Sequence, residues 1–297
     1  MISSLKISKH SSTAFAPGHI SGFFQPIYHE NNMLMTGSRG AGFSVTHGCQ
    51  TTVTLKKEKK QRISIFSDKK QIHVPVIMKA LKHLVGDAPL HIKVSNNVQL
   101  PIGQGFGMSA ASCLAAAFAT ADCLNISLKK ALTAAHQAEV ESQSGLGDVI
   151  AAFSGGIEIR RHPGIFRDDV IYQIPGALPV VLCVIDSPVD TKKVLTDRKK
   201  AEYISLIGKK CTDDLLKNPT IENFFSLSFY FTKKTGLASD KIISILDKVN
   251  GSDLASMCML GNSIFAMGKK DRLIKILEPY GKIVLTTVDE RGARVIS

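Results

Sequence analysis

The sequence contains no tryptophan, and its aromatic content is only 6%. Proteins that bind single-stranded nucleic acid stack bases on aromatic side chains, so this composition offers few stacking surfaces. The 297 residues nevertheless carry a formal charge of +12, which is the one compositional feature that indicates a polyanionic partner. A basic nucleic-acid-binding protein therefore stays open as an alternative, although a chain that works among anionic nucleotides would also suit this charge.

Long apolar runs are lacking too. The longest, Ala110 to Leu124, is interrupted by polar residues and is shorter than the roughly 20 residues that a membrane helix needs. Residues 1–10 hold no apolar stretch of the kind found in secretory signals. The six cysteines form no Cys-x-x-Cys pair, so neither a zinc site nor a disulfide framework is expected. These absences predict a globular, cytoplasmic protein without membrane contact and with reduced thiols.

The residues that are present predict a mixed fold. Short runs rich in β-branched residues between positions 13 and 66 predict an early sheet, and after Pro101 the pattern turns helical up to about Ser142. The apolar run Val180 to Asp186 predicts a central strand, and Lys282 to Thr287 predicts another. This order favours two α+β domains over a doubly wound sheet. We expect one domain over residues 1–175 and a second over residues 176–297.

A glycine-rich loop stands where the strand pattern changes to a helical one, in Pro101-Ile-Gly-Gln-Gly-Phe-Gly-Met-Ser-Ala-Ala111. Glycine lets the backbone approach a ligand closely, and the helix start adds unpaired N–H groups and a positive dipole end, so the loop is suited to phosphate. Its spacing fits neither the dinucleotide fingerprint nor a Walker A loop. The alternative is a tight turn that only packs the helix onto the strand.

One glutamate of the next predicted helix faces inward. Leu128, Leu132 and Ala135 define its apolar stripe, and at about 100° per residue Glu139 falls on that stripe while Glu141 lies nearly opposite. An inward carboxylate either binds metal or is paired with a neighbouring lysine or arginine. Glu141 is expected to be a surface charge.

Asp148 follows in the turn Ser144-Gly-Leu-Gly-Asp148, which can aim a carboxylate into a cleft or cap the next helix. Phosphoryl transfer needs a phosphate cradle, oxygen ligands for Mg²⁺ and a carboxylate that accepts or orients a hydroxyl proton. The glycine-rich loop, Ser109 with Glu139, and Asp148 could supply these three parts. The sequence therefore predicts an ATP-dependent kinase.

Three motifs in order resemble those of the GHMP kinases. Residues 101–111 are similar to the second motif of that family, Pro-x-x-x-Gly-Leu-Gly-Ser-Ser-Ala-Ala, with Phe106 for Leu and Met108 for the first Ser. Ala16-Pro-Gly-His-Ile-Ser-Gly22 resembles the first motif, and Met259-Leu-Gly-Asn-Ser-Ile-Phe-Ala266 resembles the third. Within the superfamily, the first motif, Gly37-Ser-Arg-Gly-Ala-Gly42 and Gly145-Leu-Gly-Asp148 look most like the archaeal pantoate kinases.

The resemblance implies a two-domain α+β fold, with a ribosomal-protein-like N-terminal domain and a ferredoxin-like C-terminal domain. It implies transfer of phosphate from ATP, with Mg²⁺, to the 4-hydroxyl of pantoate on the archaeal route to coenzyme A. Another alcohol, such as homoserine or mevalonate, stays open as the substrate, and so does a homodimer. His19 stands where mevalonate kinases carry lysine, which leaves open what replaces that charge.

The resemblance also implies a role for each candidate site residue. Asp148, Ser109 and Glu139 are implied to be catalytic, with Ser109 and Glu139 as metal ligands. The nucleotide is expected to bind at Pro101, Gly103, Gln104, Gly105, Phe106, Gly107, Met108, Ser109 and Ala110. Pantoate has a carboxylate and geminal methyl groups, so its pocket needs a cation or several donors beside a small apolar wall. The candidates are His19, Ser21, Ser38 and Arg39, although Arg39 could instead fix its own turn and His19 could be a satisfied buried histidine.

Overall fold

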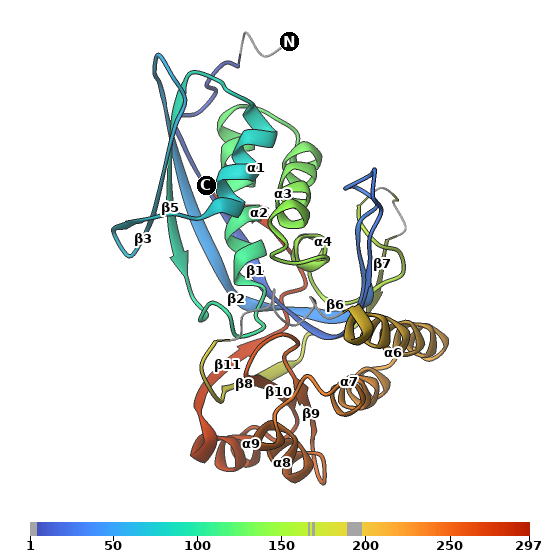
Figure 1. The fold of residues 1–297 in the computed structure, drawn as a ribbon. Coiled ribbons are helices and arrows are strands. Elements are labelled where there is room, and N and C mark those ends of the chain that lie inside the picture. Colours follow the sequence, from blue (N-terminus) through green and yellow to red (C-terminus); the bar gives the residue numbers. More distant parts are fainter. Residues whose placement is uncertain (1–4, 166, 168–169, 189–197) are drawn as a thin grey trace.

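The computed structural model describes residues 5–165, 167, 170–188 and 198–297, and it contains two sheets with helices packed against them (Figure 1). The first sheet has the order β12-β1-β2-β5-β3-β4, and β6 continues from β2 to β7. The C-terminal strand β12 returns to pair with β1. Its strands are β1 Ser11–Ile27, β2 Gly37–Lys57, β3 Arg62–Ser67, β4 Lys70–Ile72, β5 Leu90–Val98, β6 Ile157–Arg160, β7 Ile171–Ile174 and β12 Arg294–Val295.

The first two strands are much longer than the short runs in the sequence predict, and they form one antiparallel hairpin. The register between them shifts at Pro17/Gly18 and again between Ser21 and Phe23. Bulges of this kind bend a strand and re-aim its side chains. Ala16-Pro-Gly-His-Ile-Ser-Gly22 therefore lies within an irregular strand rather than in a loop.

Helix α2 (Met108–Cys123) packs on β1 and β2, and α1 (Pro75–Val85) and α3 (Leu128–Ser142) cover it. Its alanine-rich sequence is buried on all sides, which explains why α2 lacks a polar face. The short helix α4 (Asp148–Ser154) follows α3 and lies against α2 and β1. The start of α2 and the start of α4 therefore both lie close to β1.

The second sheet has the order β11-β8-β10-β9. The strand expected around Val180 is central in it, as predicted, and the strand at Lys282–Thr287 has the expected bounds. Its strands are β8 Pro179–Val184, β9 Leu254–Met257, β10 Ser263–Met267 and β11 Lys282–Thr287. The accompanying helices are α6 Arg198–Lys217, α7 Ile221–Thr235, α8 Asp240–Val249, α9 Lys270–Leu277 and the 3-10 turn η1 Glu278–Tyr280.

An aromatic cluster joins the two sheets. Phe43 of β2 lies edge-on to Phe265 of β10, with ring centroids 5.2 Å apart, and Phe224 of α7 packs against both. Gly22 on β1 lies so close to Phe224 that a Cβ there would overlap its ring. Buried aromatic pairs contribute about 0.5–1.5 kcal/mol beyond their area, so this cluster fixes how the second sheet sits on β1 and β2.

The six cysteines are buried and unpaired, as the scattered spacing predicts. Within the described residues, no helix combines the length and apolar character needed to cross a membrane.

Candidate active site

A cavity of about 570 Å³ opens where the three motif segments meet. Met259 of the third segment donates its N–H to the backbone oxygen of Ser21 in the first, at 3.1 Å. A Cβ on Gly261 would overlap the backbone of Gln104, so the third segment also presses on the glycine-rich loop. The expected site residues that line the cavity are Ser21, Ser38, Gly103, Gly105, Phe106, Gly107, Met108, Ser109 and Asp148.

The glycine-rich loop has a backbone that only glycine adopts without strain. Gly103, Gly105 and Gly107 have φ angles of +76°, +76° and +60°. A Cβ on Gly105 would lie 2.8 Å from the backbone oxygen of Met259. The loop runs directly into α2, whose first N–H groups have no partner within the helix and can meet an anion. Loop and helix start together can hold phosphate groups.

Three residues that were expected to bind the nucleotide do not line the cavity. Gln104 points to the second sheet, donating to the backbone oxygen of Asp186 at 2.8 Å and accepting from Ser263 Oγ at 3.0 Å. Pro101 is exposed, and Ala110 is buried in the core. These three can shape the loop, but they do not border the cavity.

We expect Gly105→Ala to raise the KM for ATP about tenfold to a hundredfold. Strain at a left-handed residue costs about 1–3 kcal/mol, and the Cβ adds a collision with the third motif segment. Gly251→Ala is the matched control, because the nearest atom to its Cβ would be 4.0 Å away. Steady-state kinetics in both variants check this, and an unchanged KM in Gly105→Ala would contradict it.

Glu139 and Asp148 converge on Gly145. A Cβ on Gly145 would lie 2.5 Å from Glu139 Oε1 and 3.0 Å from Asp148 Oδ2. Asp148 is the first residue of α4, whose N-cap is Gly147, so it does not serve as the N-cap. Its side chain is 29% exposed, and its Oδ1 accepts a hydrogen bond from His19 instead.

Glu139 is a buried carboxylate whose oxygens meet no described donor in good hydrogen-bond geometry, although the nearby backbone N–H of Val149 lowers its pKa somewhat. Its side chain is 1% exposed, whereas Glu141 is exposed, as the helix stripe predicts. No lysine or arginine of the described chain pairs with it; the nearest cation-forming group is His136 Nδ1 at 4.0 Å. Burial and the charge of Asp148 raise its pKa well above the usual value. An unpaired oxygen ligand of this kind suits a cation.

Within the described residues, no group of three or more His, Cys, Asp and Glu side chains gathers into a metal site. Mg²⁺ in kinases is usually held by one or two protein carboxylates and by substrate phosphates. Glu139 and Ser109, which stands at the start of α2, fit that smaller requirement.

His19 is fully buried beneath the cavity rather than in its wall. Its Nδ1 lies 2.7 Å from Asp148 Oδ1, and its Nε2 lies 3.0 Å from Glu158 Oε1. Burial alone would lower the pKa of His19, but the two carboxylates raise it to about 9. For Asp148, burial acts to raise the pKa. The hydrogen bond and charge of His19, followed by the charge of Arg160, outweigh this effect of burial and hold the pKa of Asp148 below its usual value.

The sequence gives no sign of Glu158 and Arg160, although both belong to this cluster. They alternate with isoleucines on β6, and such alternation normally predicts a charged face in water. Both are in fact buried, and Arg160 Nη1 donates to Glu158 Oε1. Arg160 also reaches Ser21 Oγ at 3.4 Å, and its Nε has no hydrogen-bond partner among the described residues.

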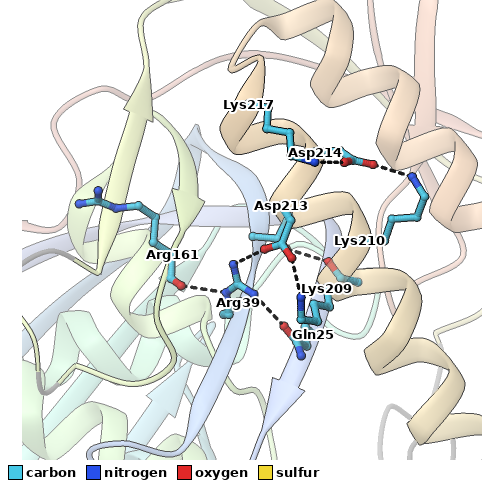
Figure 2. A network of polar contacts seen from close by, with 10 residues as sticks. Gln25, Arg39, Arg161, Lys209, Lys210, Asp213, Asp214 and Lys217 are labelled. Carbon is cyan, nitrogen blue, oxygen red and sulfur yellow. Dashed lines mark hydrogen bonds and ion pairs between the residues drawn. The ribbon is translucent and has the colours of Figure 1, made fainter.

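Arg39 is absent from the cavity lining, and it points instead toward Asp213, Gln25 and the backbone of Arg161 (Figure 2). Its Nη2 donates to Asp213 of α6 at 2.7 Å, and its Nε donates to the backbone oxygen of Arg161 at 2.8 Å. Successive side chains of a strand point to opposite faces of the sheet. Ser38 faces the cavity, and Arg39 therefore points away from it. Residues 37–42 form part of β2 and not a turn that Arg39 could fix, which is why Ser38 and Arg39 face opposite sides of the sheet.

Comparison with known proteins agrees with this geometry. Residues 73–156, which include the glycine-rich loop, Glu139 and Asp148, match the GHMP kinases N terminal domain. The pantoate kinase of Methanocaldococcus jannaschii is 36% identical over 269 residues, covering 87% of this chain and 93% of that protein. The chain belongs to the pantoate kinase family of GHMP kinases.

Solved structures confirm the GHMP kinase fold. A phosphotransferase related to the CoA biosynthesis pathway superimposes with a TM-score of 0.86 at 26% identity, over 96% of this chain and 98% of that one. The mevalonate kinase of Methanococcus jannaschii gives a TM-score of 0.65 at 15% identity, over 98% of this chain and 100% of that one, and shows the fold alone. The predicted α+β class is thus confirmed for this GHMP kinase.

Proposed function

We propose that this GHMP kinase transfers the γ-phosphoryl group of ATP to the 4-hydroxyl of pantoate, giving ADP and 4-phosphopantoate for coenzyme A synthesis. The observation that carries the proposal is the 36% identity with a pantoate kinase over nearly the whole chain. The cavity supports it, because the glycine-rich loop and Asp148 border the same space, and Glu139 lies directly behind Gly145 of the cavity wall.

In the proposed mechanism, the loop from Gly103 to Met108 and the first N–H groups of α2 hold the phosphates of ATP. Ser109 and Glu139 would hold Mg²⁺, and the ion would supply positive charge that offsets the charge of the phosphates. The 4-hydroxyl oxygen forms a bond to the γ-phosphorus while the bond from that phosphorus to the β-phosphate oxygen breaks. The hydroxyl proton passes to Asp148, and ADP leaves.

The pantoate carboxylate is proposed to lie near Ser21 and Ser38. Arg160 supports this placement, because its Nη2 reaches Ser21 Oγ. Its Nε has no hydrogen-bond partner among the described residues and lies 2.9 Å from where a Cβ on Gly147 would stand. Gly147 itself lines the cavity. A cation behind two hydroxyl groups is suited to a carboxylate. Phe24 of the cavity lining offers an apolar wall for the geminal methyl groups.

The test is ADP release by the purified protein with Mg-ATP against pantoate, mevalonate, homoserine and galactose. We expect turnover with pantoate only. Turnover with a different alcohol would keep the kinase and overturn the substrate. Absence of turnover together with steeply salt-dependent RNA binding would favour the nucleic-acid alternative that the charge of +12 left open. The cytoplasmic location, the homodimer and the domain boundary near residue 176 stay predictions.

A further inference from the structure

The His19 ring lies between two carboxylates. Asp148 Oδ1 is 2.7 Å from Nδ1, and Glu158 Oε1 is 3.0 Å from Nε2. An ionised carboxylate can only accept hydrogen bonds, whereas a neutral imidazole has one N–H and one lone pair. Both contacts are satisfied together only when both ring nitrogens carry a proton. Arg160 Nη1 also lies 3.4 Å from Nε2 and would donate to a lone pair there, but the Glu158 contact is shorter and needs a proton on Nε2, so the geometry favours an imidazolium ion.

The charges around the ring agree with that state. His19 faces Asp148 from α4, Glu158 and Arg160 from β6, and at longer range Glu139 from α3. The two positive charges of the His19 imidazolium and the Arg160 guanidinium balance the two carboxylates of Asp148 and Glu158. Glu139 adds no further negative charge when no metal is bound, because its raised pKa lets it keep its proton. A neutral His19 would leave a buried excess of negative charge, which is costly.

We propose that His19 and Glu158 are a positioning pair for Asp148, in which Glu158 keeps His19 charged and His19 fixes the orientation of the Asp148 carboxylate. The proposal rests on the proposed kinase reaction. Because Oδ1 accepts the His19 N–H, the remaining oxygen Oδ2, which borders Gly145 in the cavity wall, takes the hydroxyl proton. Glu158 acts without touching the cavity.

The backbone of His19 links this pair to the glycine-rich loop. Its N–H donates to the backbone oxygen of Phe106 at 3.0 Å, and a Cβ on Gly107 would lie 2.9 Å from its carbonyl oxygen. Gly42 on β2 leaves room for the ring, since a Cβ there would lie 2.5 Å from Nε2. His19 therefore contacts the glycine-rich loop through its backbone and orients the Asp148 carboxylate through its side chain.

The test is the pH dependence of kcat in Glu158→Gln, with ATP and pantoate saturating. In the unaltered protein, His19 keeps its proton up to about pH 9, so kcat is expected to fall only above that pH. Glu158 is the largest cause that raises the His19 pKa, so the variant should lose activity at a pH about 1–3 units lower. Glu278→Gln, an exposed residue beyond α9, is the matched control and should keep the original profile.

A second measurement needs no substitution. Two-dimensional ¹H–¹⁵N NMR of the histidine rings should show His19 protonated at both nitrogens at pH 7, with a single deprotonation near pH 9. A neutral His19 ring at pH 7, or a profile that does not shift in Glu158→Gln, would overturn the proposal. Either result can occur with full pantoate turnover in the unaltered protein, so it is distinct from failure of the proposed kinase function, which would appear as no turnover at any pH.

Discussion

Asp148→Asn is expected to lower kcat by about 10²–10⁴-fold while leaving the KM for ATP nearly unchanged, because a positioned carboxylate that accepts a proton contributes rate enhancement of this order. Asparagine keeps a side-chain oxygen that can accept the His19 N–H, so the fold and the phosphate loop should persist. What the variant loses is the second oxygen as a proton acceptor. Steady-state kinetics with pantoate and ATP check the prediction.

The matched control is Asp87→Asn, because the Asp87 side chain is 80% exposed and forms a surface ion pair with Lys82. Exposed ion pairs contribute about 0–1 kcal/mol, so this control should keep normal kinetics and stability. If Asp148→Asn turned over at near the normal rate, Asp148 would not be the proton acceptor. A loss of ATP affinity in that variant would instead point to a role in nucleotide binding.

Glu139→Gln is expected to lower kcat by about 10²–10³-fold and at the same time to stabilise the metal-free protein by about 1–3 kcal/mol. The loss of rate follows because a neutral amide is a poorer Mg²⁺ ligand than a carboxylate. The gain in stability follows because the variant removes a buried carboxyl group that no side chain of the described residues pairs with. His136 Nδ1, also unpartnered, can accept an N–H from the new amide.

The stability difference should depend on pH in a defined direction. The pKa of Glu139 is raised in the folded state, so the folded protein binds this proton more tightly than the unfolded chain does. The free energy of unfolding of the unaltered protein therefore falls as pH rises through the interval between the two pKa values, and it falls less in the variant. The advantage of Glu139→Gln is accordingly largest above that interval.

Urea unfolding of the metal-free proteins at several pH values measures this, with Glu141→Gln as the control on the same helix. Glu141 is exposed and pairs with His83 at 2.8 Å, so its replacement should change stability by no more than about 0.5 kcal/mol. A Glu139→Gln protein that is less stable than the unaltered one at every pH would show that the carboxylate has a stabilising partner when metal is absent.

The phosphate loop and its two carboxylates could be predicted because each has a local signal. Alternate glycines before an alanine-rich helix need left-handed backbone, and the helix period alone places Glu139 inward and Glu141 outward. The late strands were predictable for the same reason, since a continuous apolar run such as Val180 to Asp186 suits a strand covered on both faces.

The substrate end of the cavity could not be predicted in this way. Side-chain direction there depends on whether residues 37–42 form a loop or a strand, and the long β1–β2 hairpin decides this through pairing between distant residues. That pairing turns Arg39 toward α6. The positions of Glu158 and Arg160 could not be predicted, because Glu158 is buried against Arg160 and His19 and the alternation of residues along one strand contains no information on such a partner.

Residues near the C-terminal end of the sequence contact the glycine-rich loop and β1, and this order has a consequence for synthesis of the enzyme on the ribosome. Residues 258–261 press on the phosphate loop, and Ile296 donates its N–H to the backbone oxygen of Thr13, so the two ends of the chain share one sheet. A nascent chain that has completed the loop, Glu139 and Asp148 still lacks the contacts that residues 258–261 make with the loop and with Ser21 of β1. Phosphoryl transfer should therefore begin only after residues 258–261 have been added and have packed on the loop, and a shorter growing polypeptide should not consume ATP.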